Sequence, residues 1–167
     1  VPQSEMRPTV KRAAAMVEID SWLTQSPFEL SGGQKQRVSL AGVLVDEVDV
    51  LLFDEPLANL DPKTGKTAIE LIDDIHRRTG KTVIVIEHRL EDVLHRSVDR
   101  IILVEKGRIV ADSTPHRLVA GTRLIEAGIR EPLYITALKF AGCEIREEDE
   151  IAYVDSLDVD RFAEPVR

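Results

Sequence analysis

The chain has 167 residues, of which 43% are hydrophobic, so it can bury a core and is not a disordered tail. Its single cysteine, Cys143, excludes an internal disulfide and a multi-cysteine metal site. The net charge of -8 is concentrated in residues 144–167, which hold nine acidic and three basic side chains and are expected to form a solvated surface or linker. The rest is nearly neutral and lacks the basic surface that binds nucleic-acid phosphates.

The first part of the chain predicts two helices separated by a break. Apolar side chains recur at helical spacing over residues 9–20, and Ser26-Pro27 then interrupts the pattern. The second helix is expected over residues 31–45. Ser31 and Gln34 fit a capping box, in which both side chains satisfy backbone N–H groups at the start of the helix.

The middle of the chain predicts a strand, a helix and a second strand. Residues 48–53 form a short apolar run typical of a strand buried on both faces. Asp61 followed by Pro62 marks a helix start, and Gly80 marks its end. One face of this helix carries Ile69, Ile72 and Ile75. Residues 82–86 predict another buried strand.

Shorter elements are expected in the rest of the chain. Lys106-Gly107 is a hairpin turn between two strands, and a helix opened by Thr114-Pro115 ends at Gly121. The strands are expected at residues 100–105 and 108–111, and further helices at 89–96, 122–127 and 132–141. This order of elements predicts an α/β fold with a mainly parallel sheet.

Four features of the sequence point to chemistry, and the first is Leu30-Ser31-Gly32-Gly33-Gln34. Two glycines at a helix start let a ligand approach the backbone closely. The exposed N–H groups and the helix dipole there favour an anion such as phosphate. Taken alone, the motif is explained equally by an ordinary helix cap.

The second feature is Asp54-Glu55, at the end of the first predicted strand. Carboxylates at the carboxyl end of a strand lie where α/β sheets bind ligands. Asp54 suits Mg²⁺, which prefers oxygen ligands, and Glu55 suits the orientation of a water that attacks a phosphoryl group. The alternative is a strand that ends in acidic residues for solubility.

The third and fourth features follow the two predicted strands. Ala58-Asn59-Leu60-Asp61 lies between the first strand and the next helix, where Asp61 is also explained as the cap of that helix. His88 comes directly after the second strand, where a ring N–H can reach a phosphate. The alternative for His88 is an ordinary surface histidine.

In this order and spacing, the four features resemble the ATP-binding cassette (ABC) family of ATPases over about residues 8–125. The motif at 30–34 resembles the family signature, and residues 50–55 resemble the Walker B strand with its catalytic glutamate. Residues 58–61 resemble the D-loop, and His88 resembles the switch histidine. The resemblance implies a P-loop NTPase-like (RecA-like) fold with part of the ABC helical subdomain.

The resemblance also implies a head-to-tail dimer of nucleotide-binding domains that binds ATP and Mg²⁺. Asp54 would hold the Mg²⁺, and Glu55 and His88 would be catalytic at the domain's own nucleotide. Asp61 would cross the dimer interface. The residues expected to contact the ATP of the partner domain are Ser31, Gly32, Gly33 and Gln34.

No phosphate-binding G-x-x-x-x-G-K-[ST] loop occurs in the sequence. Gly65-Lys66-Thr67 and Gly80-Lys81-Thr82 end correctly but lack the first glycine. We therefore expect the N-terminal Walker A half to be absent, ATP binding by this chain alone to be weak, and hydrolysis not to occur. We also expect uncovered apolar surface and self-association.

Three parts are expected along the chain. Residues 1–47 would be a remnant of the helical subdomain with the signature helix, and residues 48–125 the C-terminal half of the RecA-like core. Residues 126–167 would be a C-terminal extension or acidic linker, leading toward a second cassette if the resemblance at residues 129–142 to two-cassette members holds.

The sequence most resembles the energy-coupling factor group of importers of vitamins and of cobalt or nickel, including members linked to thiamin-precursor uptake. This group implies a transmembrane transporter subunit as partner, no nucleic acid, and a cytoplasmic location, peripheral on the inner face of the cell membrane. Two alternatives stay open: a soluble ABC-type ATPase acting on nucleic acid or ribosomes, and a non-catalytic fragment.

Overall fold

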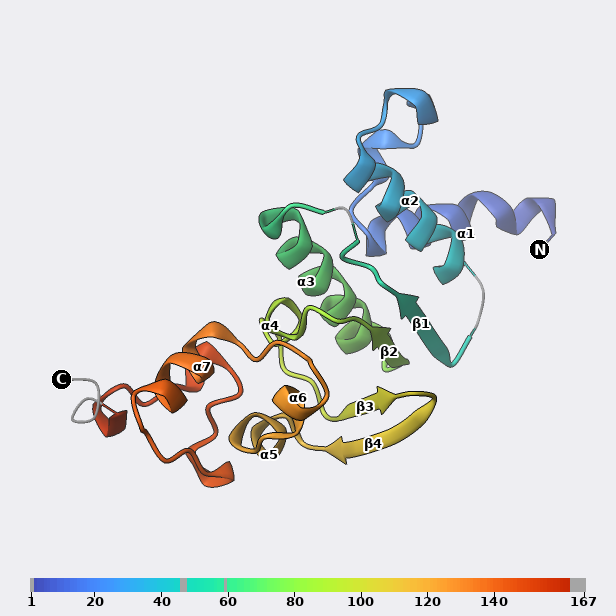
Figure 1. Cartoon of the computed structure of the whole chain (residues 1–167). Coiled ribbons are helices and arrows are strands. Elements are labelled where there is room, and N and C mark those ends of the chain that lie inside the picture. The colour runs from blue at the N-terminus through green and yellow to red at the C-terminus, as the bar shows by residue number, and fades with distance from the viewer. Residues whose placement is uncertain (1, 46–47, 59, 163–167) are drawn as a thin grey trace. The chain divides into compact units, whose positions relative to one another are not determined.

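The computed structural model describes residues 2–45, 48–58 and 60–162 and divides the chain into two compact units (Figure 1). The first unit is Val1–Ile86 and the second is Glu87–Arg167. Among the described residues, no helix is long and apolar enough to cross a bilayer.

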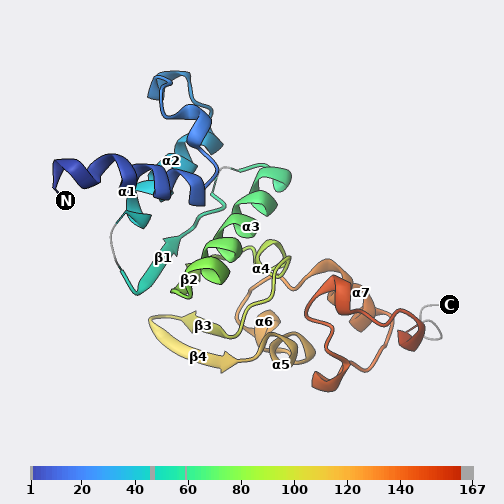
Figure 2. The same ribbon diagram turned by 180° about the vertical axis from the view of Figure 1, so that it is seen from behind.

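The first unit begins with two packed helices, α1 (Gln3–Met16) and α2 (Gly32–Leu44) (Figures 1 and 2). The predicted helix at 9–20 is displaced toward the N-terminus. It stops early because Glu18 has a φ of 59°, which a helix cannot accommodate. Between the helices, short 3₁₀ turns span Asp20–Trp22 and Pro27–Glu29. The break predicted at Ser26-Pro27 is confirmed, since Ser26 caps the second turn.

A parallel β-α-β arrangement follows. Strand β1 (Val50–Asp54) pairs with β2 (Thr82–Ile86), and α3 (Pro62–Thr79) connects them. Both predicted ends of α3 are confirmed: Asp61 caps the start, and Gly80 ends the helix with a φ of 65°. The predicted apolar face of α3 is buried at Ile69, Ile72 and Ile75.

The sheet of the first unit is covered on one face. Leu51 is 1% exposed and packs in a core with Ala14, Val17 and Ile75. On the opposite face, Leu52 and its register partner Ile84 are 63% and 48% exposed. The prediction that both strands are buried on both faces is therefore wrong, because α1, α2 and α3 supply apolar side chains to one face only. The predicted uncovered apolar surface is confirmed.

The second unit opens with α4 (Leu90–Val93) and an antiparallel hairpin of β3 (Ile101–Glu105) and β4 (Arg108–Ser113). Lys106 and Gly107 both have positive φ, as a tight hairpin turn requires, and confirm the predicted turn. Three further helices follow, as expected: α5 (Pro115–Ala120), α6 (Arg123–Glu126) and α7 (Leu133–Phe140).

Residues 143–162 are packed onto the core of the second unit. This segment has three short 3₁₀ turns (Glu147–Asp149, Val154–Ser156 and Asp160–Phe162). Ile151, Ala152 and Phe162 are buried against the core. The Tyr134 hydroxyl donates to the backbone oxygen of Ala152 at 2.7 Å, and the Tyr153 hydroxyl donates to that of Val98 at 3.0 Å.

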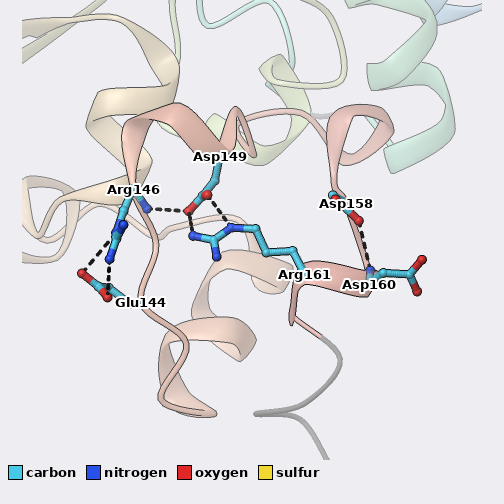
Figure 3. A network of polar contacts seen from close by, with 6 residues as sticks. All are labelled: Glu144, Arg146, Asp149, Asp158, Asp160 and Arg161. Carbon is cyan, nitrogen blue, oxygen red and sulfur yellow. Dashed lines mark hydrogen bonds and ion pairs between the residues drawn. The ribbon is translucent and has the colours of Figure 1, made fainter.

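Two acidic side chains of this segment, Glu144 and Asp149, lie in ion pairs with arginines (Figure 3). Asp149 accepts from the Arg161 guanidinium at 2.7 Å and from the backbone N–H of Arg146 at 2.8 Å. The Arg146 guanidinium in turn donates to Glu144 at 2.9 Å. Part of the negative charge of residues 144–162 is therefore paired with arginines within a segment that packs on the core.

Candidate functional site

The turn at Ser31–Gln34 forms the start of α2. The Ser31 hydroxyl accepts from the backbone N–H of Gln34 at 3.3 Å, and the Gln34 side-chain oxygen accepts from the N–H of Ser31 at 2.7 Å. The predicted capping box is confirmed. A Cβ added at Gly32 would meet nothing within 4 Å, so the turn leaves room above its backbone. These are the features that favour an anion at a helix start.

Asp54 and Glu55 stand at the carboxyl end of β1, and both are exposed. Glu55 has a φ of 47°, although it is not glycine, and its N–H donates to the Ile86 oxygen at 2.9 Å. Left-handed backbone at a non-glycine residue costs on the order of 1 kcal/mol or more and concentrates at functional sites. The buried Leu57, 0% exposed, anchors the turn that follows.

Asp61 uses its carboxylate as the cap of α3. One oxygen accepts from the N–H groups of Lys63 and Thr64, and the other accepts from the Thr64 hydroxyl at 2.5 Å. The Thr64 hydroxyl bond is the main cause that lowers the pKa of Asp61 from its ordinary value. The cap interpretation is confirmed. Asn59, in the same motif, lies outside the described residues.

A cavity of about 800 Å³ lies within the first unit, and residues of α2, β1 and α3 line it. Its lining includes Ser31, Gly33 and Gln34 from the start of α2. Asp54 from β1 lines it as well, together with apolar side chains such as Leu40, Leu51 and Leu71. The structure thus brings Ser31, Gly33, Gln34 and Asp54 to one cavity, whereas Gly32 and Glu55 are not among its lining residues.

Lys63 and Thr64 are among the other residues that line this cavity, and no sequence motif indicated them. Both follow the cap residue Asp61, and a Cβ at Gly33 would lie 3.6 Å from the Thr64 side chain. The only sequence signal for them was their position directly after Asp61-Pro62.

His88 belongs to the second unit, two residues after the end of β2. Its side chain is 68% exposed, and its Nδ1 lies 3.3 Å from a carboxylate oxygen of Glu87. The sequence motifs indicated His88 as a site residue but not Glu87. The only feature of the sequence that could have indicated Glu87 is its position directly before the histidine.

Mg²⁺ is often held by one or two protein carboxylates together with substrate phosphates. The described residues contain no group of three or more His, Cys, Asp or Glu side chains placed to hold a metal ion. The exposed carboxylate of Asp54 is an oxygen ligand of the kind that Mg²⁺ prefers. The site combines the capped start of α2 with two exposed acidic side chains, Asp54 and Glu55, at the carboxyl end of β1.

Comparisons with known proteins agree with these features. Residues 2–58 match the family described as "ABC transporter", and residues 122–167 match the family described as "ATP-binding cassette cobalt transporter". Over 162 residues, 97% of its length, the chain is 66% identical to a putative ABC transporter ATP-binding protein of Photobacterium profundum. It spans 29% of that relative's length.

Two solved structures are similar in fold. CbiO1 from Clostridium perfringens, described as part of the ABC transporter complex CbiONQ, is 30% identical with a TM-score of 0.69, over 83% of this chain and 55% of that one. MJ0796, described as a dimeric bacterial ABC transporter cassette, is 30% identical with a TM-score of 0.54, over 68% and 49%.

The fold is thus that of the P-loop NTPases, as part of an ABC cassette, which confirms the predicted fold class. The chain belongs to the ABC transporter ATPases. The match of residues 122–167 to a cobalt-transporter family and the similarity to CbiO1 agree with the predicted resemblance to the energy-coupling factor importers.

Proposed function

We propose that this chain works as part of the ATP-binding subunit of an ABC transporter, in which ATP binding and hydrolysis drive solute import. The observation that carries the proposal is the cavity of the first unit, which joins the capped start of α2 to the acidic end of β1. The capped helix start suits a phosphate of the nucleotide held by the partner domain, and the carboxylate at the end of β1 suits the Mg²⁺ of the domain's own nucleotide.

Each predicted site residue receives a role. Asp54 binds Mg²⁺, and Glu55 orients the water that attacks the terminal phosphate. His88 binds that phosphate through its ring, and Asp61 lies at the interface between two domains while it caps α3. The contacts to ATP held by the partner domain come from Ser31, Gly32, Gly33 and Gln34.

The proposed partners are a second nucleotide-binding domain and a transmembrane subunit. The described complex of CbiO1 and the described dimer of MJ0796 support both. Such a subunit works on the cytoplasmic face of the membrane. The cobalt-transporter description of the family matched by residues 122–167 supports a transition-metal ion as the solute. The three predicted parts, 1–47, 48–125 and 126–167, remain our proposed division of the chain.

The test is ATP-dependent association with a complete ABC cassette whose sequence contains a G-x-x-x-x-G-K-[ST] phosphate-binding loop. We expect a complex in the presence of ATP and Mg²⁺, measured by sedimentation, that is lost in Gly33→Asp because the added carboxylate repels the phosphate. Gly42→Asp is the control on the same helix: a Cβ there meets nothing within 4 Å, and a Cβ at Gly33 makes only an ordinary van der Waals contact with Thr64 at 3.6 Å.

Equal association by both variants would contradict the proposal. The 167-residue chain alone is expected to give no steady ATP turnover, because its sequence has no phosphate-binding loop. Turnover by the purified chain that Glu55→Gln abolishes would contradict this second expectation.

A further inference from the structure

The lining of the cavity in the first unit includes four charged side chains: Glu18, Arg37, Asp54 and Lys63. Arg37 and Glu18 neutralise each other, because the Arg37 guanidinium lies 3.0 Å from a Glu18 carboxylate oxygen. The proposed function gives Asp54 the Mg²⁺ of the domain's own nucleotide. Lys63 is therefore the cation of this lining that remains for an anionic ligand.

Lys63 faces the cavity from the first turn of α3. The α3 residues in the lining recur at helical spacing, so they form one face of the helix: Lys63, Thr64, Thr67, Ala68, Leu71 and Ile72. Lys66, three residues after Lys63, is not among the lining residues. The first turn of α3 also lies against the start of α2, since a Cβ at Gly33 would lie 3.6 Å from the Thr64 methyl group. Lys63 therefore lines the cavity beside the turn at Ser31–Gln34.

The backbone of Lys63 is held by the helix, and its side chain takes no part in holding it. The backbone N–H donates to a carboxylate oxygen of Asp61 at 3.0 Å, and the backbone oxygen accepts from the Thr67 hydroxyl at 3.2 Å. The side chain is exposed and carries its charge on a flexible stem of four carbons. A substitution at Lys63 therefore removes a charge from the cavity without removing the cap of α3.

We propose that Lys63 is a phosphate-binding residue of this site. Its ammonium pairs with the terminal phosphate of the nucleoside triphosphate that the proposed function assigns to the turn at Ser31–Gln34. A hydrogen bond between an ammonium and a phosphate is charge-assisted and stronger than a neutral one. The nucleotide as ligand rests on the proposed function, whereas the place of Lys63 in the cavity rests on the lining residues and their helical spacing.

The competing explanation is that Lys63 is an ordinary solvated surface charge. Lys63→Met and Lys66→Met separate the two explanations, because each removes one positive charge near the start of α3 and keeps an unbranched side chain. A solvated charge acts only through the screened field around the helix, so both variants would then bind phosphate equally. A direct contact is lost in Lys63→Met alone.

The first experiment is titration of the ¹⁵N-labelled 167-residue chain with sodium tripolyphosphate, followed through the backbone amide signals of Gly32 and Gly33. We expect equal dissociation constants for the original chain and Lys66→Met. That of Lys63→Met should be about tenfold higher, as for the loss of a hydrogen bond to a charged group. Lys63→Arg should restore most of the affinity, since a guanidinium also binds phosphate.

Equal dissociation constants for Lys63→Met and Lys66→Met, or no binding by the original chain, would overturn the proposal. If Lys63→Met loses the dispersed amide spectrum of the folded chain, Lys63→Gln takes its place with the same expectation.

The second experiment repeats the ATP-dependent association with a complete cassette. Lys63→Met should need about tenfold more ATP for half-maximal association, whereas Lys66→Met should behave as the original chain. Equal ATP dependence of the two variants would refute the role of Lys63 at the nucleotide. Failure of the proposed function would appear separately, as absent association of the original chain although its binding of tripolyphosphate still depends on Lys63.

Discussion

The two units use their polar side chains in opposite ways. In the first unit, Ser31, Asp54 and Glu55 lie at the ends of elements and face solvent or a cavity. In the second unit, Tyr134 and Tyr153 are directed inward and fasten residues 143–162 to the core. In the first unit these motif residues lie at the ends of elements, whereas in the second unit the two tyrosines hold a C-terminal segment onto the core.

The largest expected effect tests whether the two cores are independent. Ile75 in the first unit and Ile135 in the second are both 0% exposed, so they form a matched pair. We expect Ile75→Ala and Ile135→Ala each to cost about 3 kcal/mol. Each loss should be confined to its own unit, as measured by native-state hydrogen exchange. If either variant lowered the hydrogen-exchange protection of both units equally, the two units would share one core. The two cores would then not be independent.

The second prediction tests whether the ion pair between Asp149 and Arg161 stabilises the second unit. The Asp149 side chain is 6% exposed. The Arg161 hydrogen bond holds the pKa of Asp149 below its ordinary value of 3.8. A carboxyl with a lowered folded-state pKa stabilises the fold above its unfolded pKa, and this contribution is lost as the pH falls through the folded value. Acid should therefore weaken the second unit through this pair.

We expect Arg161→Met to lower the stability of the second unit near neutral pH, and to lower it less as the pH falls below 3.8 and through the lowered folded pKa of Asp149. Denaturant unfolding near neutral pH and below pH 3.8 measures this. Arg123→Met, which removes an exposed pair with Glu126, is the control and should have almost no effect. A loss that is the same at both pH values would rule out the charge pair as its cause.

The smallest effect on stability is expected at the open face of the first unit. Replacing Leu52 and Ile84 together by glutamine should change stability by less than about 1 kcal/mol, since both are about half exposed or more. Self-association, measured by sedimentation over a range of concentrations, should fall in this variant. If the original chain were monomeric at all concentrations, the expectation that this open face causes self-association would be wrong.

Local chemistry explains which predictions from sequence were accurate. The boundaries of α3 follow from Asp61 and Gly80, and the start of α2 follows from the Ser31–Gln34 box, because caps involve residues close in sequence. The burial of β1 depends on which other elements cover each face of the sheet. The residues of the strand itself carry no information about those elements.

The same reasoning applies to the candidate site. The types and order of Asp54, Glu55 and His88 were readable, and they agree with the family shown by the comparisons. Their individual roles stay predictions. The burial of Glu87 and the left-handed backbone of Glu18 and Glu55 were not readable, because they depend on the packing around each turn.

The backbone of Glu55 has a consequence for how this site can change over generations. Its φ of 47° is one that glycine and asparagine adopt more easily than glutamate. A substitution to either would relieve backbone strain while removing the acid proposed to orient water. Thermostability and turnover therefore favour different residues at this position, and a lineage released from selection for turnover would gain stability by giving up the acid.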